Sequence, residues 1–292
     1  MNFSENHFFF KNNELGHNLY GVDYIPEEPT GEAFIFLQPL GSERNVIDAV
    51  IINLARTFAK HGIRVLRFDY YGTGDSEGDF TSITLASLMS DIDTGMSLFS
   101  NNAGITSTGL LGVRFGSLLA SHFAEQTLNT IKHLILCAPV INAFDYINKE
   151  LMQALSMQTV LFNEIIWDRI KIIHELLEGQ STVVQGYNLA NLNGFPLTKE
   201  LFLSIKDIDT TTHRKNYDFD CLLVNIDTRK RKRNKIIEAL EKKYSKAKKV
   251  DTCEIIEKTI PWVHGKHLLK TSDTLNKTII NWLRTNGKTD QI

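Results

Sequence analysis

Cysteine is scarce in this sequence of 292 residues, which excludes a fold held together by disulfides. The three cysteines, Cys137, Cys221 and Cys253, are odd in number and widely spaced. No two of them have the spacing of a zinc-ligand pair. The pattern indicates reduced thiols, so we expect a cytoplasmic protein.

Long apolar runs are absent as well. No stretch approaches the roughly 20 apolar residues that a membrane-spanning helix needs. The first six residues, MNFSEN, lack the basic and apolar regions of a signal peptide. The sequence therefore predicts a protein without a membrane span.

The motifs of common nucleotide and metal sites are also lacking. Gly72 and Gly74 open a glycine-rich turn, but no third glycine stands where G-x-G-x-x-G requires it. Neither a G-x-x-x-x-G-K-[ST] phosphate loop nor an H-E-x-x-H zinc motif is present. We therefore expect no cofactor and no metal.

A strong net charge is missing too, although charge is unevenly distributed. The formal net charge is −2, yet residues 229–249 hold eleven Lys or Arg against two Glu, and the remainder carries −11. That remainder would repel nucleic acid phosphates, so we expect no nucleic acid partner. The basic segment is either a solvated helix face or a docking surface, at Arg229, Arg231 and Arg233, for an acidic acyl carrier protein.

What the sequence does contain is a regular alternation of strand-like and helix-like segments. Strands are expected at residues 18–24, 33–38, 63–68, 107–111, 134–138, 221–226 and 254–260, and helices at 45–60, 85–99, 115–128, 232–246 and 273–285. Continuous apolar strands separated by helices indicate a parallel sheet covered on both faces. The expected fold class is α/β, with a doubly wound, mostly parallel sheet.

One segment, residues 142–216, interrupts this alternation. It has no strong strand pattern but contains a long helical pattern, roughly residues 144–178. We expect a helical cap inserted into a core made of residues 1–141 and 217–292, because lids commonly cover the carboxyl ends of strands.

The most informative motif follows the expected strand 107–111. Gly112 and Gly116 flank Arg114 with the spacing of the G-x-S-x-G nucleophile elbow of α/β hydrolases, between a strand and a helix. The geometry is kept while the serine is replaced. Ser107 lies within the strand and Ser117 about one turn inside the helix, so we expect both to be structural.

Arginine at this position excludes conventional nucleophilic catalysis, because it stays protonated and cannot attack a carbonyl. Its fork of donors, at a helix N-terminus, suits a carboxylate, phosphate or oxyanion. We therefore predict a substrate-binding Arg114 with Val113 and Phe115 beside it. The alternative is a structural arginine that pairs with a nearby carboxylate.

A second loop should lie close to this elbow. In this fold the loop after the strand 33–38 contributes a backbone N–H to the oxyanion hole, and here it includes Leu40, Gly41, Glu43 and Arg44. Glu43 can pair with Arg114, or the charged residues can form a polar substrate-binding cluster. The sequence leaves both interpretations open.

Candidates for an acid and a base follow the elbow in the usual order. Asp227 ends the strand 221–226, where the acid belongs, and His264 follows the last strand, where the histidine belongs. His267 is an alternative base three residues on.

Together these runs resemble the exosortase-A-system-associated hydrolases, a branch of the serine-aminopeptidase type of α/β hydrolases. The matching runs are spread over most of the chain, at residues 38–45, 67–80, 111–116, 138–140, 179, 185–187, 261–262 and 282–283. In that branch arginine commonly replaces the elbow serine, so the resemblance implies that Arg114 follows a family pattern. It also implies a role near acyl activation and acyl carriers. The loop Leu40-Gly41-Ser42 departs from the more aromatic and acidic family loop.

Two functions remain in view. The first is an enzyme on a small acyl, ester or thioester substrate, in which Arg114 binds an anionic group and His264 with Asp227 acts as general base. The second is a catalytically silent protein of this fold that binds an acyl ligand or a carrier partner. Fold alone does not decide between them.

Overall fold

The computed structural model describes residues 2–102, 104–127, 130–212, 216–230, 234–258 and 272–286. Within these ranges an eight-stranded sheet has the order β1-β2-β4-β3-β5-β6-β11-β12. Its strands are β1 (Phe3–Lys11), β2 (Asn18–Pro26), β3 (Glu32–Leu37), β4 (Arg64–Phe68), β5 (Ser107–Val113), β6 (His133–Cys137), β11 (Tyr217–Asp227) and β12 (Ala247–Ile256). The six strands from β4 to β12 in this order are parallel, and the hairpin of β1 and β2 adds antiparallel strands at one edge.

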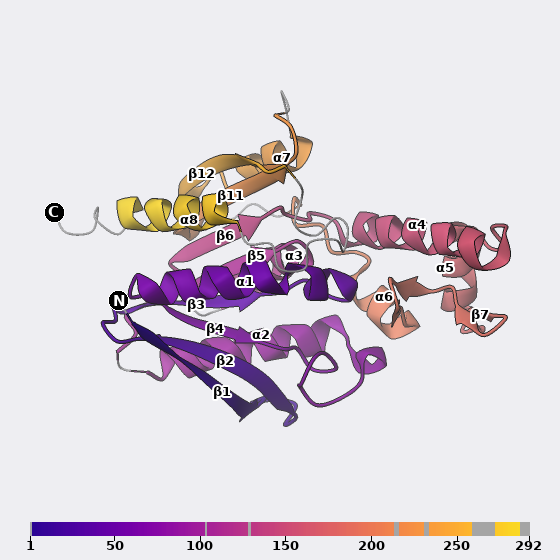
Figure 1. Ribbon diagram of the computed structural model, residues 1–292, viewed down its shortest axis with the longest axis horizontal. Helices are drawn as coiled ribbons and strands as arrows, with labels where there is room; N and C mark the ends of the chain where they lie inside the picture. Colours follow the sequence, from indigo (N-terminus) through magenta and orange to yellow (C-terminus); the bar gives the residue numbers. More distant parts are fainter. Residues whose placement is uncertain are drawn as a thin grey trace.

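Helices cover both faces of the sheet (Figure 1). Those that follow the sheet strands are α1 (Ser42–Lys60), α2 (Leu85–Ser100), α3 (Phe115–Gln126), α7 (Lys235–Lys243) and α8 (Asp273–Asn286). Side chains of α1 and α8 join one apolar core, and those of α2, α3 and α7 join the other. The central strands lie between both cores, which is why β6 is buried along its whole length. This is the doubly wound arrangement that the sequence predicts.

The last sheet strand differs from its expected bounds. Strand β12 begins at Ala247, not at residue 254, because its first residues pair in parallel with β11 from Tyr217 onward. The helix before it is correspondingly shorter than expected. The segment from Ala247 lies at a half-exposed edge, and its apolar residues Ala247, Val250 and Cys253 are three apart, so it lacks the alternation typical of a strand. Residues 259–260 and 232–233, which complete the expected strand and helix, lie outside the described residues.

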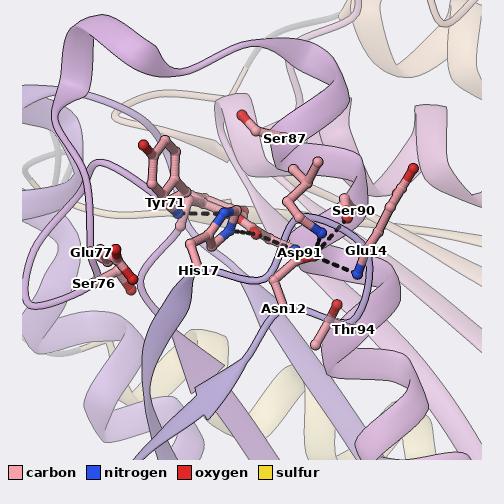
Figure 2. A network of polar contacts seen from close by, with 12 residues as sticks. Asn12, Glu14, His17, Tyr71, Ser76, Glu77, Ser87, Ser90, Asp91 and Thr94 are labelled. Atoms are coloured by element: carbon pink, nitrogen blue, oxygen red, sulfur yellow. Dashed lines mark hydrogen bonds and ion pairs between the residues drawn. The ribbon is translucent and has the colours of Figure 1, made fainter.

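Strand β1 is absent from the sequence expectations, and Figure 2 shows what holds its hairpin in place. Asp91 of α2 is fully buried and accepts hydrogen bonds from Asn12 Nδ2 at 2.8 Å, His17 Nε2 at 2.7 Å and the Tyr71 amide at 2.8 Å. The His17 and Tyr71 rings stack with centroids 4.3 Å apart. The hairpin turn is thus tied to α2 by buried polar bonds, which a hydrophobic pattern does not reveal.

The described residues between β6 and β11 form three helices and two short hairpins. These elements are α4 (Ala143–Phe162), α5 (Arg169–Leu177), β7 (Val183–Val184), β8 (Tyr187–Asn188), β9 (Asn191–Leu192), β10 (Phe195–Pro196) and α6 (Lys199–Ile205). The single expected helical pattern is therefore two helices. Asn163 ends α4 in the left-handed conformation, with φ of 60°, and Asp168 caps α5 through its side chain.

This segment leaves and rejoins the core at one place. Asn142 forms an isolated antiparallel bridge with Asp209, and the Thr210 amide donates to the Ile141 carbonyl at 2.8 Å. Helix α4 projects beyond the sheet, on the side away from α8 (Figure 1). We propose that residues 142–216 form a cap on the core.

Candidate functional site

The turn between β5 and α3 has the geometry of a nucleophile elbow. Arg114 adopts φ 54° and ψ −121° and immediately precedes α3. A Cβ on Gly112 would lie 2.4 Å from the Gly116 carbonyl oxygen, and a Cβ on Gly116 would lie 2.0 Å from the Leu37 carbonyl oxygen. Both positions therefore require glycine, which explains the G-x-R-x-G pattern at atomic level. The arginine occupies the apex of a strained turn.

The Arg114 side chain is engaged by Glu43 of α1. Its Nε and Nη2 atoms donate to Glu43 Oε1 at 3.0 and 2.9 Å. Tyr146 of α4 donates from its hydroxyl to Glu43 Oε2 at 3.0 Å. The two charged side chains are only 11% and 9% exposed, so the pair is largely shielded from water. This arrangement matches the ion-pair interpretation of the two residues.

A second carboxylate, Glu150 of α4, interacts electrostatically with Glu43 and Arg114. Glu150 is 3% exposed and accepts a hydrogen bond from Asn193 Nδ2 at 2.8 Å. Burial raises its pKa to about 7, and the negative Glu43 adds to this while Arg114 and Lys149 oppose it. A carboxyl group with such a pKa can gain or lose a proton near neutral pH.

The loop before α1 is covered by the segment 142–216. Gly41 adopts φ 62°, and a Cβ there would lie 3.3 Å from the Leu192 carbonyl oxygen of strand β9. Leu40 is buried, and Phe195 of β10 packs on Phe80 with ring centroids 5.0 Å apart. The hairpin of β9 and β10 thus lies directly on the loop expected to supply an oxyanion donor.

Arg44, also expected at the site, is held by a different partner. Its Nη2 atom donates to Asp69 Oδ1 at 2.5 Å, and the Asp75 amide donates to Asp69 Oδ2 at 3.0 Å. A Cβ on Gly74 would lie 1.9 Å from Asp69 Oδ2, so the glycine allows this contact. Arg44 therefore stabilises the loop after β4 through Asp69.

A cavity of about 220 Å³ lies beside Arg114. Its walls are the segment after β6, one side of α4 and the start of α7, namely Arg114, Pro139, Val140, Ile141, Asn142, Asp145, Tyr146, Lys149 and Ile236. Two larger hollows, of about 550 and 500 Å³, share Thr106, Ser107 and Lys132 at the opposite edge. The smaller cavity is the candidate site, because ligands of open α/β sheets bind at the carboxyl ends of the strands.

The remaining expected site residues fall into three groups. Val113 and Phe115 are buried beside the elbow, and Phe115 packs on Tyr146 with ring centroids 5.0 Å apart. Asp227 ends β11 at the same edge as Arg114, is 7% exposed, and accepts the Thr228 amide at 2.7 Å. The two candidate bases, His264 and His267, lie outside the described residues.

The two serines near the elbow are placed differently. Ser117 is 1% exposed, donates to the Arg114 carbonyl at 2.5 Å and accepts the Val140 amide at 3.0 Å. Ser107 begins β5, at the edge far from Arg114. Both positions suit a structural serine.

The basic segment begins near the cavity. Arg229 and Lys230 are exposed just after β11, and Ile236 of α7 lines the cavity. Arg231 and Arg233 lie outside the described ranges. In the part of the chain that the structure describes, no helix is long and apolar enough to cross a membrane, and no cluster of three His, Cys, Asp or Glu is arranged to hold a metal.

Sequence reasoning missed Tyr146, Glu150 and Asn193. Tyr146 and Glu150 are four residues apart, so they share one face of α4. That spacing is a signal, but nothing in the sequence says that this face meets Arg114. Asn193 stands in a two-strand hairpin with φ of 53°, which only tertiary packing brings to Glu150.

Solved structures similar to this chain share its fold at low identity. Est1E from Butyrivibrio proteoclasticus, with bound ferulic acid, is 17% identical, with 95% of this chain and 98% of that chain covered and a TM-score of 0.61. The esterase Pf2001 from Pyrococcus furiosus is 15% identical, with 97% and 91% covered and a TM-score of 0.60. Proline iminopeptidase from Mycobacterium smegmatis is 13% identical, with 98% and 100% covered and a TM-score of 0.60.

A comparison with curated proteins gives no match. The family model described as serine aminopeptidase, S33, matches residues 49–225, which is more than half of the chain. The matched region includes the elbow, the segment 142–216 and nearly all of β11. The sheet, the elbow and this match agree: the chain has the α/β-hydrolase fold and belongs to the serine aminopeptidase S33 family of hydrolases.

Proposed function

We propose that this protein cleaves or transfers the acyl group of a small ester or thioester without a covalent serine intermediate. The observation that carries the proposal is Arg114 at a strained elbow, beside an apolar cavity at the carboxyl edge of the sheet. Arg114 would bind a carboxylate or the developing oxyanion, helped by the positive end of α3. In hydrolysis, a water oxygen bonds to the acyl carbon while the C–O or C–S bond breaks.

Proton transfer in this reaction needs a base and an acid. We assign the base to His264 with Asp227, following the order of residues in the fold. The base would take a proton from water and return it to the leaving oxygen or sulfur. Glu150, with its pKa near 7, is a further group that could exchange a proton beside Arg114.

The cavity supports an apolar acyl chain as the occupant. Pro139, Val140, Ile141 and Ile236 supply apolar walls, and Lys149 brings a positive charge to the lining. A volume of about 220 Å³ suits a short chain better than a long fatty acid. Est1E binds ferulic acid, a carboxylic acid, in the same fold.

We further propose that the chain falls in the exosortase-A-system-associated branch, because Arg114 stands where that branch commonly has arginine. A tethered acyl group on an acidic carrier protein is then a candidate substrate. The exposed Arg229, close in sequence to the cavity residue Ile236, supports docking there, together with Arg231 and Arg233.

The second candidate is a catalytically silent protein that binds an acyl ligand or carrier. The Glu43–Arg114 pair favours it, since Glu43 already takes two guanidinium donors. An incoming anion must share or displace this contact. Substrate turnover separates the two candidates.

The test is hydrolysis of p-nitrophenyl esters and acyl thioesters of increasing chain length, with ligand binding measured on the same proteins. The enzyme proposal predicts turnover by the wild type and its loss in the His264→Ala and Arg114→Ala variants. Binding of the acid product with no turnover in any variant would identify the silent protein. Turnover unaffected by both substitutions would refute the proposed site.

Carrier docking is tested separately. An acyl-loaded acidic carrier should bind the wild type strongly at low salt and lose affinity as salt screens the contact. An Arg229/Arg231/Arg233→Glu variant should bind it weakly. Equal affinity of the two proteins at low salt would exclude this docking surface.

A further inference from the structure

The outer half of α4 exposes apolar side chains. Met152, Met157, Val160 and Leu161 are 44–75% exposed, and Ile165 follows the helix with 55% exposed. The helical period places these exposed residues on one side of α4: one half of its circumference holds positions 152, 153, 156, 157, 160 and 161. We call Met152, Met157, Val160, Leu161 and Ile165 the outer face of α4. Nine of the fourteen large exposed apolar residues in the described chain lie in the segment 142–216, so the exposure is concentrated there.

Hydrogen bonds to α4 fix the turn that follows this face. Gln158, on the opposite side of α4, is fully buried. Its Oε1 atom accepts the Ile166 and Trp167 amides at 2.9 and 3.0 Å, and its Nε2 atom donates to the Trp167 carbonyl at 2.9 Å. The turn after α4 is therefore fixed to the helix, and the apolar side chains are not those of a frayed end.

The scarcity of charged residues on this face limits the kinds of partner that it can bind. Residues 151–163 contain no Asp, Glu, Lys, Arg or His, in a chain of which 23% is charged, and the exposed Glu164 stands at the end of the face, beside Ile165. A face that met an acidic carrier or an anionic membrane would carry Lys or Arg. In a two-fold symmetric contact the same surface patch is used on both copies, and the uncharged helical part of the face brings no like charges together.

We propose that the outer face of α4 is the interface of a symmetric dimer, in which α4 of one copy lies against α4 of the second. The five side chains expose on the order of 500 Å² per copy, so complete burial in a pair would remove about 1,000 Å² from water, which reaches the lower limit for a specific interface. Methionine suits such a contact because its flexible side chain fills irregular gaps. Tyr146 and Glu150 lie in the N-terminal half of the same helix. The dimer would therefore stabilise the helix whose Tyr146 contacts Glu43, the partner of Arg114.

The test is sedimentation equilibrium from about 1 to 200 µM, which detects a dimer whose dissociation constant is micromolar. We expect a dimer for the wild type and an association weakened about 100-fold or more in Val160→Asp, because the contact would bury an unpaired carboxylate. Leu15→Asp is the matched control, since Leu15 is 51% exposed in the β1–β2 turn, and it should remain dimeric. Unchanged circular dichroism of both variants establishes that they are folded.

Two results would overturn the proposal. One is a wild type that stays monomeric at the highest concentration. The other is a Val160→Asp variant that dimerises as well as the wild type. A wild-type monomer that floats with phosphatidylcholine vesicles, through a contact that Val160→Asp removes, would assign the face to lipid instead.

Discussion

The two guanidinium nitrogens that Arg114 directs at Glu43 converge on one oxygen, Oε1, while Tyr146 holds the other. Glu43 thus competes with any anion that would bind Arg114. We predict that Glu43→Gln raises the affinity for a short-chain carboxylate about 10-fold, because a neutral amide holds the guanidinium less strongly. Isothermal titration calorimetry measures this. Arg114→Ala should abolish the binding, and a carboxylate that binds all three proteins equally would show that Arg114 is not its site.

The same pair predicts a stability effect. Arg114→Ala leaves Glu43 buried without its charged partner, which costs about 3–5 kcal/mol of unfolding free energy. The double variant Glu43→Gln with Arg114→Ala should recover part of that loss, because no lone charge remains buried. Urea unfolding of the two single variants, the double variant and the wild type completes the cycle. Strictly additive effects would mean that the two side chains do not interact.

Glu150 predicts a pH-dependent stability. Its folded pKa of about 7 lies above the ordinary value of 4.5, so the folded state binds more protons than the unfolded state between these values. Stability should therefore fall as pH rises through this window, by on the order of 3 kcal/mol in total. Glu150→Gln removes this contribution, so its unfolding free energy relative to wild type should increase from pH 5 to pH 8. Glu164→Gln, at an exposed position, is the control, and a Glu150→Gln profile parallel to the wild type would contradict the assignment.

The elbow glycines predict a large backbone effect. In Gly116→Ala the new Cβ would lie 2.0 Å from the Leu37 carbonyl oxygen, a backbone atom that moves only with β3. We expect a loss of more than about 3 kcal/mol, or no folded protein at all. Gly104→Ala is the matched control, because the nearest atom to its Cβ is 3.4 Å away and belongs to the Asn102 side chain. Thermal unfolding checks both, and a nearly neutral Gly116→Ala would mean that the elbow is looser than described.

Serine-directed probes give a further prediction. A fluorophosphonate should leave the wild type unlabelled, because Ser117 is buried with its hydroxyl engaged and Ser107 lies at the far edge of the sheet. Mass spectrometry of the probe-treated protein measures this. Stoichiometric labelling of either serine would contradict it. Arg114→Ser is the informative companion, since labelling of that variant would demonstrate that an activating base stands beside the elbow.

Local patterns in the sequence account for much of the fold. Gly112 and Gly116 predict the elbow because both are sterically required there, and strand order alone brings Asp227 to the edge that carries Arg114. The hydrophobic periodicity of the sequence does not predict which side chains of α4 and the β9–β10 hairpin contact each other. Glu150 and Asn193 contact each other only through the packing of α4 on the β9–β10 hairpin.

Two other features escaped prediction for different physical reasons. Strand β1 is an edge strand with mostly exposed side chains, and buried polar bonds at Asn12 and Asp91, which carry no periodic signal, anchor its turn. Asn163 ends α4 by adopting a left-handed conformation that asparagine tolerates but does not require. The helical pattern continues past it, so the break is invisible until the chain folds.

The bridge between Asn142 and Asp209 places the two ends of the long segment between them side by side. A chain that returns to its point of departure imposes almost no length constraint on what lies between, and each doubling of such a loop costs only about 0.6 kcal/mol. The sheet and Arg114 can therefore keep their positions when the segment between Asn142 and Asp209 is lengthened, shortened or replaced. A grafted segment from another hydrolase, joined at these two residues, would change what covers the cavity and leave the path of the core chain intact.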